Sequence, residues 1–159
     1  MTRQVLPNVY RIGRQLLMLA AALLLAPAAL GTVTLTPHAA EYKVKISVVS
    51  GRLRTELRET ESGYVARHTI APTGLSKLVA RGSIAEVSEF SSGPDGLIPL
   101  AYQTNDSLSR DKVRADIRFD WDSNEASGVV NDEDVQTALE GLSHDRVSIQ
   151  YELMYDLLN

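Results

Sequence analysis

The chain has no cysteine among its 159 residues. This absence excludes disulfide bonds, thiol nucleophiles, thiolate metal sites, covalent haem attachment and a lipidated amino-terminal cysteine. The folded protein must therefore be stabilised by packing without covalent cross-links. Because an oxidising compartment permits disulfides without requiring them, the absence does not argue against export.

A surplus of basic residues is also absent. The chain has 16 Lys and Arg against 20 Asp and Glu, which gives a formal net charge of −4. The first 28 residues contain three arginines and no acid, so without them 13 basic residues stand against 20 acidic ones and the net charge becomes −7. With no run of Lys or Arg, the sequence predicts no nucleic-acid partner and disfavours binding to anionic membrane surfaces.

Motifs for a cofactor, a metal or a catalytic group are missing too. Residues 143–145, Ser-His-Asp, have the residue types of a hydrolase triad, but sequence neighbours diverge around a helix and cannot converge on one reacting atom. Residues 120–124 resemble the start of a calcium loop, but Glu125 occupies the glycine position and Asn131 that of the bidentate glutamate. We therefore predict that residues 143–145 begin a helix and that residues 120–124 form a hairpin turn. No cofactor or metal is predicted.

The amino-terminal segment carries the clearest pattern in the sequence. Three arginines precede the uncharged run 16–26, and Pro27 and small residues follow it. The order basic, apolar, small is typical of a secretory signal peptide. The run is shorter than the ~20 apolar residues of a membrane-spanning helix, and Pro27 interrupts it. We predict a signal peptide over residues 1–28, which directs the chain to the periplasm by the general secretory route.

Cleavage after Ala28 fits this pattern, and cleavage after Gly31 or Ala39 remains open. Residues 29–39 are then expected to form a disordered linker, followed by a β domain over residues 40–159. The alternative is an uncleaved signal anchor. After cleavage, no part of the chain is expected to contact the membrane.

From Glu41 onward, apolar and polar residues alternate, which is typical of strands with one buried face. The expected strands cover residues 41–48, 52–58, 64–70, 84–90, 97–104, 112–121 and 126–130. Residues 49–51 are predicted to be a turn, and the acidic residues 132–134 a solvated loop. Strands of this kind, joined by short turns about every 10 residues, indicate an antiparallel meander.

A helix is expected near the end of the chain. Ser143 can cap it, and Val147, Tyr151, Met154 and Leu158 recur at helical spacing. We therefore predict a mainly β fold: a curved antiparallel meander sheet or partial barrel, with an N-terminal signal-peptide helix and one C-terminal helix covering part of its concave side.

Several short motifs resemble a family of exported bacterial proteins catalogued as a domain of unknown function, number 3108. The motifs are residues 40–42, 88–90, 96–99 with Tyr102, 119–121, and 141–145 ahead of Ser148, Tyr151 and Leu153. The resemblance implies a periplasmic, mainly β domain with no assigned activity. Members of that family continue past the end of this chain, so it also implies a domain that is incomplete at its C-terminal end, with poor solubility or dependence on a partner.

Four residues are candidates for ligand binding. Tyr42, Phe119 and Trp121 lie on the predicted apolar faces of their strands, where they are core residues or a ligand platform. His68 is predicted to point inward as well, as a hydrogen-bonded core residue, a base or a ligand. No catalytic residue is nominated.

Two functions fit these observations. The first is a binding or scaffolding module of the cell envelope, whose sheet holds an apolar or lipid-like ligand, or a segment of a partner protein. The alternative is a periplasmic hydrolase that pairs Asp116 or Asp120 with Glu86 or Glu89. The charged faces of the strands disfavour the hydrolase, because most of these acids alternate outward into water.

Overall fold

The structure is a computed structural model that describes residues 34–46 and 49–158. The predicted signal peptide over residues 1–28 lies outside the described residues. The first strand begins at His38, so the last two residues of the segment 29–39, expected to be a linker, belong to the sheet.

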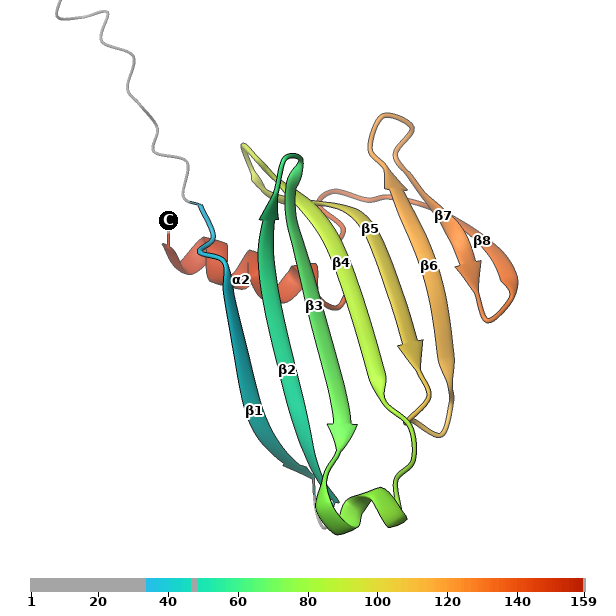
Figure 1. Ribbon diagram of the computed structural model, residues 1–159. Coiled ribbons are helices and arrows are strands. Elements are labelled where there is room, and N and C mark those ends of the chain that lie inside the picture. Colours follow the sequence, from blue (N-terminus) through green and yellow to red (C-terminus); the bar gives the residue numbers. More distant parts are fainter. Residues whose placement is uncertain (1–33, 47–48, 159) are drawn as a thin grey trace, which may run out of the picture. The chain divides into compact units, whose positions relative to one another are not determined.

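The described residues form an eight-stranded antiparallel sheet in which each strand pairs with the next along the chain (Figure 1). The predicted meander is therefore confirmed, and the sheet is not closed. The strands are β1 (His38–Ile46), β2 (Val49–Thr60), β3 (Gly63–Pro72), β4 (Ile84–Gly93), β5 (Gly96–Asp106), β6 (Val113–Asp120), β7 (Glu125–Val130) and β8 (Glu133–Ala138).

Two local predictions were wrong. Residues 49–51, expected to be a turn, belong to β2 and pair with β1. The acidic residues 132–134 are not a loop, because Asn131 and Asp132 form a two-residue hairpin turn and β8 follows it. Both turn residues have positive φ angles, 51° and 68°, which Asn and Asp tolerate better than other non-glycine residues.

A bulge in β5 decides which of its side chains face the core. Glu89 of β4 pairs with Ala101, whereas the next residue, Phe90, pairs with Pro99, so β5 carries one extra residue. The extra residue reverses the alternation of the strand. Leu97 and Tyr102 are therefore both buried although an even number of residues separates them.

The helix α2 (Ser148–Leu158) covers one face of the sheet, which we call the inner face (Figure 1). The opposite face is the outer face. The core lies between α2 and the sheet, and its buried side chains are Leu35, Leu57, Tyr64, Ala66, Phe90, Leu97, Tyr102, Val147 and Tyr151. Full burial of an aliphatic or aromatic side chain contributes about 1.5–3 kcal/mol each.

The helix differs from its prediction at both ends. Val147 and Tyr151 are buried as expected, but Met154 and Leu158, predicted to continue the apolar stripe, are exposed. The cap residue is Asp145 and not Ser143, whose hydroxyl donates to the carbonyl of Glu140. Only the first turns of α2 therefore pack on the sheet.

Candidate functional site

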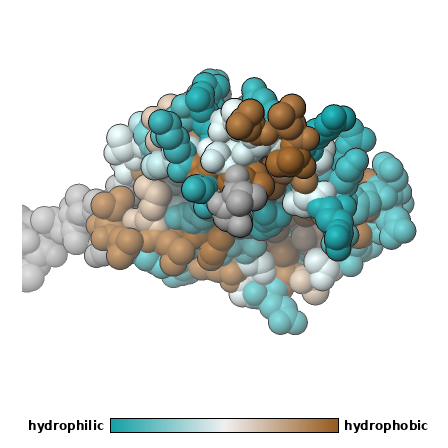
Figure 2. All heavy atoms as spheres, turned by 90° about the horizontal axis from the view of Figure 1, so that it is seen from below, coloured by the Kyte–Doolittle hydropathy of each residue, from teal (hydrophilic) through white to brown (hydrophobic). Residues whose placement is uncertain are grey.

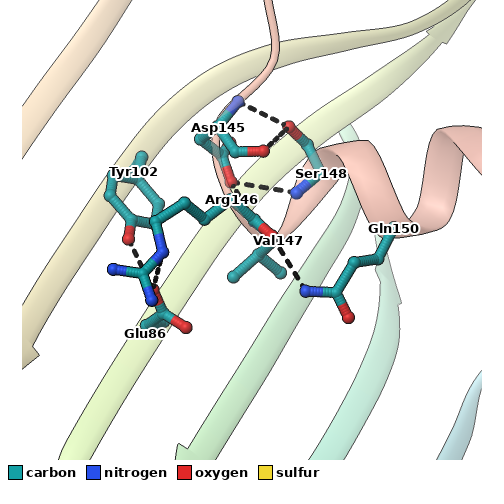
Figure 3. Close-up of polar contacts among 7 residues, drawn as sticks. All are labelled: Glu86, Tyr102, Asp145, Arg146, Val147, Ser148 and Gln150. Carbon is teal, nitrogen blue, oxygen red and sulfur yellow. Dashed lines mark hydrogen bonds and ion pairs between the residues drawn. The ribbon is translucent and has the colours of Figure 1, made fainter.

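A buried polar cluster lies beneath the start of α2, and Figure 3 draws its members Glu86, Tyr102 and Asp145. It is built from side chains of β3, β4, β5 and the segment that leads into the helix, and every member is buried. The members are His68, Glu86, Ser88, Tyr102 and Asp145.

Asp145 joins the helix to the sheet. Its Oδ1 accepts hydrogen bonds from the backbone N–H groups of Val147 and Ser148, at 2.8 and 2.9 Å. The hydroxyl of Ser148 accepts in return from the N–H of Asp145 at 3.0 Å, which completes a reciprocal capping box. The other carboxylate oxygen of Asp145, Oδ2, accepts a hydrogen bond from the hydroxyl of Ser88 on β4 at 2.7 Å. One carboxylate thus caps α2 and anchors it to the sheet.

Glu86 is the second acid of the cluster. Its Oε1 accepts a hydrogen bond from the hydroxyl of Tyr102 at 2.6 Å and lies 3.4 Å from Nε of Arg146 (Figure 3). Burial raises the pKa of Tyr102, and the hydrogen bond to Glu86 raises it further because it stabilises the neutral phenol. Tyr102 therefore stays a hydrogen-bond donor at neutral pH.

His68 packs against α2, as its predicted inward orientation requires. Its Nε2 lies 3.4 Å from the hydroxyl of Tyr151. Burial lowers the pKa of His68, and the negative charges of Glu86 and Asp145 offset part of this effect. Burial also raises the pKa of Tyr151 to about 12.

The cluster has the residue types of a hydrolase site but not its geometry. Ser88 has no exposed surface and donates to Asp145, while His68 is engaged with Tyr151. A nucleophilic serine needs a base that accepts its proton and an approach for the substrate. What this arrangement does is fix the start of α2 on the sheet.

The structure does not bring the proposed hydrolase acids together. Glu86 is buried on the inner face, but Glu89 is exposed on the outer face. Asp116 is exposed there as well and accepts from the amide of Gln103 at 3.2 Å. Asp120 accepts from the N–H groups of the turn that follows, mainly that of Ser123, and this lowers its pKa.

The four predicted ligand residues do not converge on one site. Tyr42 is 53% exposed on β1. Phe119 and Trp121 stack at a ring distance of 6.4 Å at the end of β6, and the indole N–H of Trp121 donates to the carbonyl of Pro99 at 2.6 Å. The sheet order places β1 five strand spacings from β6, or about 24 Å along the sheet. His68 lies on β3 between them, beneath α2.

Tyr42 belongs instead to a row of side chains across the inner face. The strand register places its members opposite one another, in the order Tyr42, Leu53, Ile70, Ile84, Asp106 and Val113. Tyr42 is exposed and the other apolar members are partly buried, so α2 leaves part of their surface accessible. The carboxylate of Asp106 is satisfied by the N–H groups of Leu108 and Ser109. We call this set the apolar row.

A small apolar hollow of about 70 Å³ adjoins the row. Its lining is almost entirely apolar and comes from Val44, Val49, Gly51, Ile70, Ala71, Pro72 and Leu108. The sequence predicts the apolar face of each strand, but among the members of the row it nominates only Tyr42 for ligand binding. The other members could be found only once the pairing register of adjacent strands was known.

The outer face gathers charges that are dispersed in the sequence. On β1 to β3, basic side chains outnumber acidic ones there, with Lys43, Lys45, Arg52, Arg54, Arg58 and Arg67 against Glu41 and Glu56. Lys43 and Arg52 stand directly opposite each other, although Arg52 also pairs with Glu41 at 3.1 Å. A shallow groove of about 370 Å³ crosses this area beside Arg54 and Arg67.

Fold and site together define a mainly β protein: an open eight-stranded antiparallel meander with one C-terminal helix. Comparisons with known protein families, curated proteins and solved structures find no match. Among the described residues, no helix is long and apolar enough to cross a membrane. Nor does that part of the chain contain a group of three or more acidic or histidine side chains that could hold a metal ion.

Proposed function

We propose that the protein is a non-catalytic binding module of the cell envelope, whose curved sheet holds an apolar or lipid-like ligand along the apolar row. The observation that carries this function is the row itself. It crosses six adjacent strands on the face that α2 leaves partly open.

Burial of apolar surface favours a ligand that covers the apolar row. Each square ångström of apolar surface removed from water contributes about 25 cal/mol. Leu53, Ile70 and Ile84 are only half-buried, so a ligand lying across them would remove their remaining apolar surface from water. The adjoining hollow beside Ile70 and Leu108 offers room for a branch or an end of the ligand.

The polar cluster supports a binding role more than a catalytic one. Its hydrogen bonds hold α2 in place, and Ser88, the hydroxyl that could react, is inaccessible. Location in the cell envelope rests on the predicted signal peptide. The resemblance to the exported family is consistent with it and stays a prediction.

A fluorescent fatty acid with a dansyl group tests the proposed function. We expect saturable binding to the full chain, and competition by unlabelled palmitate. Ile70→Thr should weaken binding about tenfold, because it removes roughly 1.4 kcal/mol of apolar contact. Ile98→Thr is the matched control, since Ile98 is also half-buried but lies on β5 outside the row.

The control should bind as the unchanged chain does. If Ile70→Thr and Ile98→Thr bind the probe equally well, the ligand does not lie along the row. If the unchanged chain shows no saturable binding, the protein does not hold an apolar ligand of this class.

A further inference from the structure

The connection between β3 and β4 exposes three large apolar side chains. It contains the short helix η1 (Gly74–Leu78), which lies beyond the ends of the strands (Figure 1). Leu75, Leu78 and Val79 are 84%, 74% and 77% exposed. Figure 2 views this end of the sheet and shows apolar surface beside hydrophilic side chains. We call these three residues the apolar tip.

Hydrogen bonds on both sides hold the tip away from the sheet. The hydroxyl of Ser76, which is buried, accepts from the N–H of Ser50 at 2.7 Å, and the N–H of Thr73 donates to the carbonyl of Ser50 at 2.9 Å. At the other end of the connection, three hydrogen bonds join Ser83 and Ser107. Because Ser76 is fixed inward, its apolar neighbours are directed into solvent.

Basic side chains lie within and next to the connection that carries the apolar tip. Lys77 and Arg81 are exposed within the same connection. Arg110 and Lys112 are exposed in the neighbouring loop, which the bonds of Ser107 join to it. Acidic groups at this end are fewer. Asp106 is buried, and among the charged residues of the two connections only Asp111 is an exposed acid.

An apolar tip with cations beside it fits one kind of partner best. Large side chains that stay in water are unfavourable, and contiguous apolar patches mark interaction sites. A groove in another protein would bury the leucines but would not by itself require the cations. An anionic bilayer accommodates both, because apolar side chains enter the boundary of headgroups and acyl chains while Lys and Arg remain at the headgroups.

We propose that this end of the protein docks on an anionic lipid bilayer, with Leu75, Leu78 and Val79 inserted and Lys77 and Arg81 at the headgroups. The negative net charge of the chain is a weak objection. The acidic residues 132–134 lie beside Arg114, two residues after Lys112, but they follow β7, three strand spacings from β4 where the connection of the tip ends, or about 14 Å along the sheet. This exceeds the screening length of about 8 Å at physiological ionic strength.

The absence of cysteine provides a direct test. Leu78→Cys and Leu157→Cys each create one labelling site for an environment-sensitive thiol-reactive dye. Leu157 is 86% exposed on α2, so it is a matched apolar control away from the tip. The full chain is mixed with phosphatidylcholine vesicles that contain phosphatidylglycerol, and in parallel with vesicles of phosphatidylcholine alone.

We expect the emission at position 78 to shift to the blue on the anionic vesicles only, and the shift to weaken as salt is added. Emission at position 157 should stay unchanged. Because the amino-terminal segment is identical in both samples, any binding through it affects both equally. No shift at position 78, or equal shifts at both positions, would overturn membrane docking through the tip.

Charge reversal tests the role of the cations. In the Leu78→Cys background, Lys77→Glu together with Arg81→Glu should raise the lipid concentration at half-maximal shift at least about tenfold. Arg67→Glu together with Arg118→Glu, which makes the same change in net charge at exposed positions on β3 and β6, should change it less than about twofold. Equal effects of the two changes would show that net charge, and not the tip, governs binding.

Discussion

The hydroxyl of Ser88 on β4 donates to Oδ2 of Asp145 at 2.7 Å, which joins two residues 57 positions apart in the chain. The same carboxylate caps α2. Asp145 is therefore one of two buried acids, with Glu152, that join α2 to the sheet, and its removal should be costly for stability.

Asp145→Ala should destabilise the protein by about 2–4 kcal/mol. It removes a helix cap, worth about 1 kcal/mol, and leaves the buried hydroxyl of Ser88 without an acceptor, at a cost of about 1–3 kcal/mol. Urea unfolding followed by circular dichroism measures the change. Asp156→Ala, at an exposed position on the same helix, is the control and should change stability by less than about 0.5 kcal/mol. Similar losses in the two variants would contradict the anchoring role of Asp145.

Stability should fall as pH falls through the range in which histidine titrates. Burial lowers the pKa of His68 below its ordinary value of 6.5, so the unfolded chain binds this proton more readily than the folded one. The contribution of His68 is therefore fully present above about pH 6.5 and is lost as the pH approaches its folded pKa. Glu86 and Asp145 face the same ring and reduce the effect, and His38 adds to it.

His68→Gln should remove this part of the pH dependence. Glutamine can still hydrogen-bond to Tyr151 but does not titrate. The free energy of unfolding is compared at about pH 7.5 and about pH 5.5, on either side of the ordinary histidine pKa. An unaltered slope in His68→Gln would show that the buried ring is not its source.

Gly96 is required where β5 begins. Its φ angle is 133°, and a Cβ atom there would collide with the carboxylate of Glu152, which accepts from the N–H of Leu97 at 2.6 Å. Gly96→Ala should cost about 2–3 kcal/mol, mainly from backbone strain, with a smaller part from displacement of that carboxylate. Gly74→Ala, at φ 55° with no neighbouring atom within 4 Å of the added Cβ, should cost about 1 kcal/mol. Thermal unfolding separates the two, and equal losses would contradict the role of Glu152.

Alternation in the sequence predicted the meander because each strand carries its own period-two pattern. It missed β8, since Val135 is the only large apolar side chain between Glu133 and Ala138, and all six residues are exposed. The acidic residues suggested a loop, but the decisive feature was the ability of Asn131 and Asp132 to adopt positive φ angles. The loop prediction rested on charge alone, and the turn geometry explains why a strand forms instead.

The candidate sites were harder to predict than the fold. The inward orientation of His68 followed from alternation and is confirmed by its burial. The sequence favours Ser143 as the cap because its side chain also suits that position, but the N–H groups of Val147 and Ser148 donate to Asp145. The apolar row and the basic residues next to the tip come from separate strands and loops, so they depend on register and not on any local pattern.

The most direct test of the proposed binding function locates the ligand itself. A spin-labelled stearate is added to the full chain with isotope-labelled methyl groups, and the broadening of methyl resonances is recorded by NMR. Binding along the apolar row predicts strong broadening at Leu53, Ile70 and Ile84, with little effect at Leu157 on α2. Unaffected methyl groups of the row, or broadening confined to Leu157, would contradict it.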